Sequence, residues 1–361
     1  MLLAGPGAAV HAQEQINDEQ QTTKVAIVSL AAELAHIASR LAGAAAHNGS
    51  LGGHIRHRRP HPAAAVPQTQ EAAVQNINKG LVQSVPVEFN GHNLTVVALS
   101  HDEYVGSHIL RTRTPWQADL LGPLMDKVRP GSVVVDAGAN MGDFAIFLAA
   151  ATGPTGVVYA FEPQARMFQL VCTNMIINGL LHMVPMRNAL SYEPGELHMS
   201  DKVTDGSAGG MEYKDADVND KVTINYGGMR LGLGGETVPA ITLDSMNLTD
   251  VSVIKVDIQG AEKLMFYGAQ ETIKRNLPVV AYESVEAGMA TAVDAELQLP
   301  QHVKDFNVDT FLKSLGYTTQ VFGSDNIGTP PANATAGGRR RMLQGGSRRR
   351  ILAVPPNRRR Q

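Results

Sequence analysis

Apolar residues follow two different periods along the chain between about residues 132 and 323. Runs of consecutive apolar residues, which are typical of strands buried on both faces, occur in "SVVVDAG", "GVVYAFEP", "VSVIKVDIQG" and "LPVVAYES". Segments with apolar residues at helical spacing separate these runs, among them "MGDFAIFLAAAT" and "QARMFQLVCTNMIINGL". The alternation predicts an α/β fold in which helices cover both faces of a mostly parallel sheet.

The segments around this alternation predict further elements. Two apolar runs flank "NGHN" in "VPVEFNGHNLTVVALS", which indicates a hairpin. We expect a helix over 116–128, a strand in "HMVPMRNAL" that its proline shortens, and a helix in "VDTFLKSLGY" before a last strand, "TTQVFG". A polar, glycine-rich insert at about 191–235 predicts a lid, a binding loop or a disordered segment.

The composition changes toward both ends and divides the chain into three regions. Residues 1–83 are low-complexity or linker sequence with a candidate amphipathic helix over 24–43, residues 84–323 form the folded domain, and residues 324–361 are a disordered, arginine-rich tail. Residues from Gly337 onward contain nine arginines and no acid, so the chain before Gly337 has a net charge of −12, against −3 for the whole chain. No nucleic-acid partner is therefore expected for the acidic core.

The N-terminal region bears on the location of the protein. Its most apolar segment is interrupted by Glu33, His36 and Arg40, so no transmembrane helix is expected. The start "MLLAGPGAAVHAQ" ends like a signal-peptide cleavage site but lacks a basic start and a full apolar core. We expect a cytoplasmic protein by default, with the lumen of the secretory pathway as the alternative if the N-terminus is a shortened signal segment.

The segment "VVVDAGANMGDF" has the form of a nucleotide-binding turn. Asp136 ends a strand, and Gly138, Asn140 and Gly142 follow in the spacing D-x-G-x-N-x-G. No Gly-Lys-Ser/Thr follows, which excludes a phosphate-binding P-loop, and Asn140 stands where a dinucleotide fold requires glycine. A carboxylate before the turn repels a diphosphate and attracts a cation. This chemistry matches S-adenosylmethionine, which carries an ammonium and a sulfonium but no phosphate.

The next strand ends in "AFEP" and places Glu162 just beyond the sheet. An acid there can accept hydrogen bonds from both ribose hydroxyls of an adenosine. Folds that bind nicotinamide dinucleotides share this feature with folds that bind S-adenosylmethionine. Glu162 therefore indicates a ribose without naming the cofactor.

Several segments in this order resemble the FkbM-type methyltransferases, a class I family that depends on S-adenosylmethionine. They are "VVVDAGANMGDFAIFLA", "AFEPQARMFQLVCTNMIINGL", "NAL", "ITLDSM", "IKVDIQGAEKLMFYGAQ" and "PVVAYES", and the resemblance covers about residues 86–320. It implies a Rossmann-like three-layer sandwich with a mostly parallel seven-stranded sheet whose last strand is antiparallel. It also implies a cofactor site in which the turn lines the methionine moiety, Glu162 holds the ribose and the strand end borders the adenine, with the residues Asp136, Gly138, Asn140, Gly142, Glu162, Asn188 and Ala189.

The same resemblance places Asp257 at a strand end, facing the transferable methyl group. An alcohol acceptor benefits from a general base, and the candidates are Asp257 and Glu283. The family pattern here is Asp-x-Glu-Gly-x-Glu, whereas this chain has Gln259 in place of the first glutamate. A glutamine can bind an acceptor but cannot take its proton, so we expect an altered acceptor preference and intact cofactor binding. The spacing does not require a metal, and none is expected.

We therefore predict a methyltransferase that uses S-adenosylmethionine and transfers its methyl group to oxygen on a sugar or other small metabolite. The resemblance is the source of this acceptor class, a small molecule or glycan. Two alternatives remain open: an NAD(P)-binding Rossmann oxidoreductase, and a degenerate, non-catalytic domain that binds S-adenosylmethionine. Gln259 and the long low-complexity ends favour the last of these.

Overall fold

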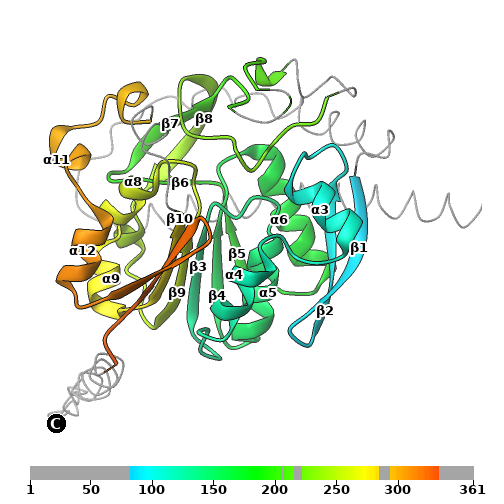
Figure 1. The fold of residues 1–361 in the computed structure, drawn as a ribbon, viewed down its shortest axis with the longest axis horizontal. Coiled ribbons are helices and arrows are strands. Elements are labelled where there is room, and N and C mark those ends of the chain that lie inside the picture. Colours follow the sequence, from blue (N-terminus) through cyan, green and yellow to red (C-terminus); the bar gives the residue numbers. More distant parts are fainter. Residues whose placement is uncertain (1–81, 205–206, 208, 215–221, 284–292, 333–361) are drawn as a thin grey trace, which may run out of the picture.

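A seven-stranded sheet forms the centre of the computed structural model, which describes residues 82–204, 207, 209–214, 222–283 and 293–332 (Figure 1). The strand order is β11-β12-β10-β9-β3-β4-β5. The strands are β3 (Val133–Ala137), β4 (Val157–Phe161), β5 (Met183–Met186), β9 (Val251–Val256), β10 (Val279–Glu283), β11 (Thr318–Phe322) and β12 (Asp325–Thr329). Strands β10, β9, β3, β4 and β5 are parallel, and β12 is antiparallel to β10 and to β11. The predicted α/β class, with a mostly parallel sheet and an antiparallel end, is confirmed.

Helices cover both faces of the sheet (Figure 1), and the two largest apolar clusters of the described residues lie between the helices and the sheet. The first cluster includes residues of α3 (Val105–Thr112), α4 (Ala118–Met125), α5 (Asp143–Thr152) and α6 (Ala165–Ile177). The second includes residues of the 3₁₀ helix η1 (Leu243–Met246), α8 (Glu262–Tyr267), α9 (Gln270–Asn276) and α12 (Val308–Ser314). The short helix α11 (Gln301–Lys304) adjoins α8. All six residues of β9 are buried, as expected for a central strand covered on both sides.

The predicted hairpin is present and packs against α6. Strands β1 (Val82–Phe89) and β2 (His92–Leu99) pair around an Asn-Gly turn in which both residues have positive φ. Asn174 of α6 accepts a hydrogen bond from the Val97 nitrogen (2.7 Å) and donates to the Val97 oxygen (3.0 Å). It also donates to the Met141 oxygen (2.8 Å), so one side chain ties the hairpin to the turn after β3.

The insert expected as a loop at 191–235 contains regular structure, and the prediction was wrong at its two ends. Strands β7 (Gly195–Ser200) and β8 (Gly234–Ile241) pair with β6 (Ala189–Leu190) in a second sheet of order β6-β8-β7. The single strand expected in "HMVPMRNAL" is divided between the two sheets, as β5 and β6. Glycines and polar residues interrupt the apolar alternation of β7 and β8, which explains why the pattern concealed them.

Two further expectations are corrected after residue 260. One helix was expected after Gly260, but α8 and α9 are separate. Gly268 lies between the two helices and packs against the backbone of Ser191. A side-chain carbon there would lie 2.0 Å from the Ser191 oxygen, so only glycine fits. One last strand was expected before a tail beginning at residue 324, but β12 lies beyond that boundary and inserts between β11 and β10. The candidate helix at 24–43 and the tail from residue 333 lie outside the described residues.

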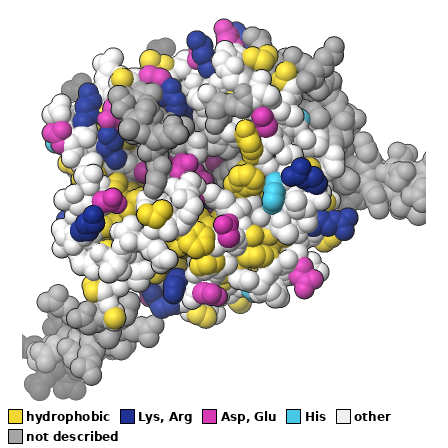
Figure 2. Space-filling model, in the orientation of Figure 1, with side chains coloured by type: hydrophobic (Ala, Val, Ile, Leu, Met, Phe, Trp, Pro, Cys, Tyr) yellow, Lys and Arg dark blue, Asp and Glu magenta, His cyan; other side chains and the backbone are white. Residues whose placement is uncertain are grey.

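The described surface mixes both signs of charge. Figure 2 shows acidic and basic side chains interspersed over the described part of one face, unlike the continuous basic surface of a typical nucleic-acid-binding protein. Within the residues that the structure describes, no helix is long and apolar enough to cross a membrane.

Candidate active site

A cavity of about 350 Å³ opens at the carboxyl ends of β3, β4, β9 and β10. The chain runs from β3 outward to β4 and β5, and later from β9 outward to β10, so the strand order reverses between β3 and β9. Ligands of open α/β sheets bind at such a reversal. Trp116 and Gln117, which directly precede α4, form part of the wall, and a segment between β7 and β8 supplies Asn225, Gly227 and Met229.

The turn after β3 brings three strand ends together. Gly138 has φ +78°, and a side-chain carbon there would lie 1.8 Å from the Asp257 oxygen, so only glycine fits. The nitrogen of Gly138 donates to the Phe161 oxygen at the end of β4 (3.0 Å), and the Asp257 nitrogen donates to the Ala137 oxygen (3.0 Å). The turn therefore fixes the position of Asp257 relative to the first two strands.

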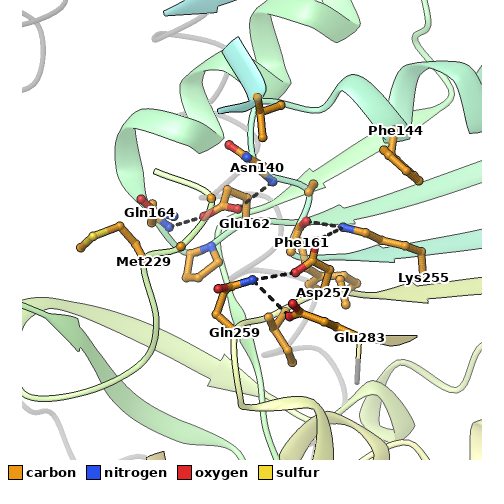
Figure 3. Close-up of a pocket in the computed structure, with 18 of the residues that line it drawn as sticks. Asn140, Phe144, Phe161, Glu162, Gln164, Met229, Lys255, Asp257, Gln259 and Glu283 are labelled. Atoms are coloured by element: carbon orange, nitrogen blue, oxygen red, sulfur yellow. Dashed lines mark hydrogen bonds and ion pairs between the residues drawn. The ribbon is translucent and has the colours of Figure 1, made fainter. Parts of the chain in front are cut away.

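Glu162 lies on the cavity wall and is only 3% exposed. One carboxylate oxygen accepts a hydrogen bond from the Asn140 nitrogen (2.9 Å), and the other accepts one from the Gln164 nitrogen (2.8 Å; Figure 3). Burial raises the pKa of Glu162 to about 8, although both backbone hydrogen bonds lower it. Each carboxylate oxygen can accept more than one hydrogen bond, which leaves capacity for hydroxyl donors in the cavity.

Asp136 is fully buried and does not line the cavity. Its carboxylate lies 3.3 Å from the ammonium of Lys255, which does line the cavity and donates to the Gly138 oxygen (2.7 Å). Burial lowers the pKa of Lys255, but Asp136 and Asp257 outweigh it and raise that pKa, so the lysine stays charged. The predicted partner of a cationic ligand is thus already paired with a lysine of the chain.

Three other predicted cofactor residues and one unpredicted acid take different positions. Gly142 does not line the cavity but packs against α6, where a side-chain carbon would lie 3.1 Å from Val171 Cα. Asn188 and Ala189 line the cavity between β5 and β6. Asp143 follows Gly142, lines the cavity and is 4% exposed, and burial raises its pKa to about 7.

The three predicted catalytic residues lie together on the cavity wall. The amide nitrogen of Gln259 donates to Asp257 Oδ1 (3.0 Å) and to Glu283 Oε2 (3.2 Å), so it bridges the two carboxylates (Figure 3). Gln259 has φ +53°, and its hydrogen bond to Asp257 directs its side chain back toward the end of β9. Glu262 does not line the cavity. Its carboxylate instead accepts hydrogen bonds from the nitrogens of Ile258 (3.0 Å) and Gly260 (3.3 Å).

The segment between β7 and β8 is held over the cavity by Tyr226, which the sequence analysis did not identify. The Tyr226 side chain is fully buried, and its hydroxyl contacts His101 Nε2 (2.9 Å) and Arg166 Nη1 (3.0 Å). Its backbone nitrogen donates to Asp102 (3.2 Å), and its oxygen accepts from the Gln164 amide (3.0 Å). An aromatic residue within the glycine-rich "NYGGMRLGLGG" was a signal that an ordered wall could be present.

Comparison with known proteins identifies the family. A model of the methyltransferase FkbM domain matches residues 136–319, which is just over half of the 361-residue chain. No curated protein sequence matches the chain. The family found is not one of dinucleotide-dependent oxidoreductases, which the sequence had left open.

Solved structures resemble the chain only distantly. An FkbM methyltransferase from Methylobacillus flagellatus is 13% identical with a TM-score of 0.33, covering 63% of this chain and 55% of its own. The chain thus spans little more than half the length of that protein. An O-methyltransferase from Thermotoga maritima is 10% identical with a TM-score of 0.34, covering 68% of this chain and 78% of its own. The family match, and not these likenesses, carries the assignment: the chain belongs to the FkbM methyltransferase family, whose cofactor is S-adenosylmethionine.

Proposed function

We propose that the protein methylates a hydroxyl oxygen of a sugar or other small metabolite by in-line transfer from S-adenosylmethionine. The observation that carries the proposal is the cluster of Asp257, Gln259 and Glu283, which adjoins the glycine turn on the wall of one cavity. The sugar or small-metabolite class comes from the resemblance to the family.

The residues present suit the cofactor. The cavity, at about 350 Å³, falls within the usual range for a small-molecule site. Glu162 would accept the ribose hydroxyls, Asn188 and Ala189 would border the adenine, and the turn at Gly138 and Asn140 would line the methionine moiety. When bound, S-adenosylmethionine supplies a methyl group that is already activated on a sulfonium. Asn140 Oδ1 is buried without a hydrogen-bond partner among the described residues, which supports a ligand at the turn.

Asp257 is the better placed of the two candidate bases. It belongs to the strand end that touches the glycine turn, whereas Glu283 lies one strand farther from it. The Asp257 side chain is 30% exposed, and the Gln259 amide fixes one of its oxygens. We assign Asp257 as the group that accepts the hydroxyl proton, and Glu283 as a group that binds the acceptor.

Gln259 orients the acceptor site and takes no proton. Both hydrogens of its amide group are directed to carboxylates, and this holds Asp257 and Glu283 in one arrangement. A glutamate in its place would put three carboxylates together, and like charges at this distance repel. The glutamine therefore supports the view that the site is adapted to a different acceptor and is not degenerate.

The test is methyl transfer from labelled S-adenosylmethionine to fractionated metabolites and glycans. Removal of a general base by Asp257→Asn should slow transfer about 10²- to 10⁴-fold. Affinity for S-adenosylhomocysteine, the demethylated cofactor, should stay within about threefold, because Asp257 is not among the proposed cofactor ligands. An Asp257→Asn variant with the wild-type rate would refute the role of Asp257. A Gln259→Glu variant that transfers much faster to the same acceptor would show that the wild type lacks a base.

A further inference from the structure

One end of the cavity, called the acceptor end here, presents side-chain donors that already make hydrogen bonds within the protein. It is formed by Gln117, Asp257, Gln259, Glu283 and Ser324. The Gln259 amide nitrogen donates to both neighbouring carboxylates, at 3.0 and 3.2 Å (Figure 3). What it can still offer a ligand is its amide oxygen, an acceptor.

The opposite side of the acceptor end repeats this arrangement. Gln117 and Ser324 both donate to Asp325 Oδ2, at 3.3 and 3.1 Å. Asp325 is 6% exposed and pairs with Glu283 across β12 and β10, so these donors belong to the same end of the cavity. The described acceptor end therefore presents hydrogen-bond acceptors. The Ser324 hydroxyl, both hydrogens of the Gln259 amide and one hydrogen of the Gln117 amide are engaged with carboxylates.

The charged side chains on the cavity wall are mostly acidic. Its described acids are Asp143, Glu162, Asp257 and Glu283, and its one described lysine or arginine is Lys255. Lys255 is already paired with Asp136, 3.3 Å away and behind the wall. Because burial raises the pKa of Glu162 to about 8 and that of Asp143 to about 7, the negative charge comes mainly from Asp257 and Glu283. The cofactor contributes one net positive charge, from its ammonium and sulfonium against its carboxylate. With Lys255 offset by Asp136, these two carboxylates still leave the acceptor end negative.

Asp143 independently indicates that a donor enters from the cavity. This carboxylate is 96% buried and lines the cavity beside Trp116, from whose backbone it accepts a hydrogen bond. Its Oδ2 atom has no hydrogen-bond partner among the described residues. An unpartnered carboxylate oxygen on the wall of a cavity can accept a hydrogen bond from a bound ligand.

We propose that the methyl acceptor carries a protonated amine, which Glu283 binds while Asp257 receives the hydroxyl. The inference rests on the proposed function and adds the charge of the acceptor. An ammonium group supplies donors to the carboxylate oxygens at this end of the cavity, and it has no lone pair to compete with the hydroxyl for the methyl group. Trp116, which also lines the cavity, favours the same charge, since aromatic faces attract cations. A carboxylate or phosphate in place of the amine would face the carboxylates of Asp257 and Glu283, and like charges repel, so such acceptors are excluded.

Three hexoses of similar shape and different charge test this proposal: glucosamine, glucose and glucuronate. Each is titrated into protein saturated with S-adenosylhomocysteine, at a pH where the amine is protonated, and binding is followed by calorimetry. One charged hydrogen bond should make glucosamine bind about tenfold more tightly than glucose, and glucuronate should show no saturable binding. Absence of a preference for glucosamine, whether all three bind alike or none binds, overturns the proposal.

Two variants change the preference in opposite directions. Glu283→Gln should bring the affinity for glucosamine close to that for glucose, and Gln259→Glu, which adds a third carboxylate, should widen the difference. Glu271→Gln is the control, because Glu271 is exposed on α9 and does not line the cavity. Should Glu283→Gln lose S-adenosylhomocysteine binding, Gln259→Glu decides, and an unchanged or narrower difference overturns the proposal. Failure of the wild type to bind S-adenosylhomocysteine would instead count against the proposed function.

Discussion

Replacing Gly138 by alanine tests the close contact between the cofactor turn and Asp257. Two costs are expected. The positive φ of +78° strains a residue with a side chain by about 1–2 kcal/mol. The added carbon would lie 1.8 Å from the Asp257 oxygen, which must retreat by about 1.6 Å to reach an ordinary contact of 3.4 Å. Such overpacking costs about 1–3 kcal/mol, so the free energy of unfolding should fall by about 2–5 kcal/mol in total.

Gly91 provides a matched control for the strain. It has φ +76° in the hairpin turn, and a side-chain carbon there meets nothing within 4 Å. Gly91→Ala should therefore lose only the strain of about 1–2 kcal/mol. The gain from a less flexible unfolded chain applies to both variants and cancels in the comparison. Their difference isolates the contact with Asp257.

Thermal unfolding and calorimetry with S-adenosylhomocysteine measure the two consequences. At about 2–4 °C per kcal/mol for a domain of this size, Gly138→Ala should lower Tm by about 4–20 °C and Gly91→Ala by about 2–8 °C. Gly138→Ala should also lose most of its affinity for S-adenosylhomocysteine, because the turn and the end of β9 must separate. Equal losses of Tm in the two variants, with S-adenosylhomocysteine binding intact in both, would refute the reasoning.

Three further variants test neighbouring parts of the structure. Burial raises the pKa of Glu162 from 4.5 to about 8, so the carboxyl ionises at lower pH in the unfolded state, and the free energy of unfolding falls as pH rises through this window. In urea unfolding, Glu162→Gln should show a smaller fall in the free energy of unfolding between pH 5 and pH 8. A fall as large as in the wild type would show that other groups cause it. Lys255→Met leaves Asp136 buried without its partner and should lower the free energy of unfolding, measured in urea, by about 3–5 kcal/mol. Adding Asp136→Asn should restore part of that loss, and a double variant as unstable as the single one would contradict the pairing. Asn174→Ala removes three hydrogen bonds to the backbone and should lower the free energy of unfolding by about 2–4 kcal/mol. The Val97 amide should exchange its hydrogen faster, and unchanged exchange there would show that other contacts hold the hairpin.

The central sheet was predictable because its strands are buried on both faces and follow strict local patterns. The apolar runs that became β3, β4, β9 and β10 alternate with helical segments, and each has the predicted type in the structure. The second sheet was not predictable on the same basis. Strands β7 and β8 are partly exposed, so their sequence needs few apolar residues. The position of β12 depends on an edge of the sheet far away in the chain, which a local pattern does not show.

The candidate site was predictable where its polar residues directly follow strands. Glu162, Asp257, Gln259 and Glu283 all line one cavity, although their roles remain predictions. The pairing of Asp136 was missed because its partner lies within another strand. A lysine inside the apolar run "VSVIKVD" was the available signal, because a buried charge requires a partner.

Calorimetric titration of the wild-type protein with S-adenosylhomocysteine tests the central claim most directly. We predict saturable binding with one site per chain, and no competition from NADH, because the turn carries Asn140 and not the glycine of a dinucleotide fold. Absence of heat with both S-adenosylhomocysteine and S-adenosylmethionine, or displacement of either by NADH, would contradict the account.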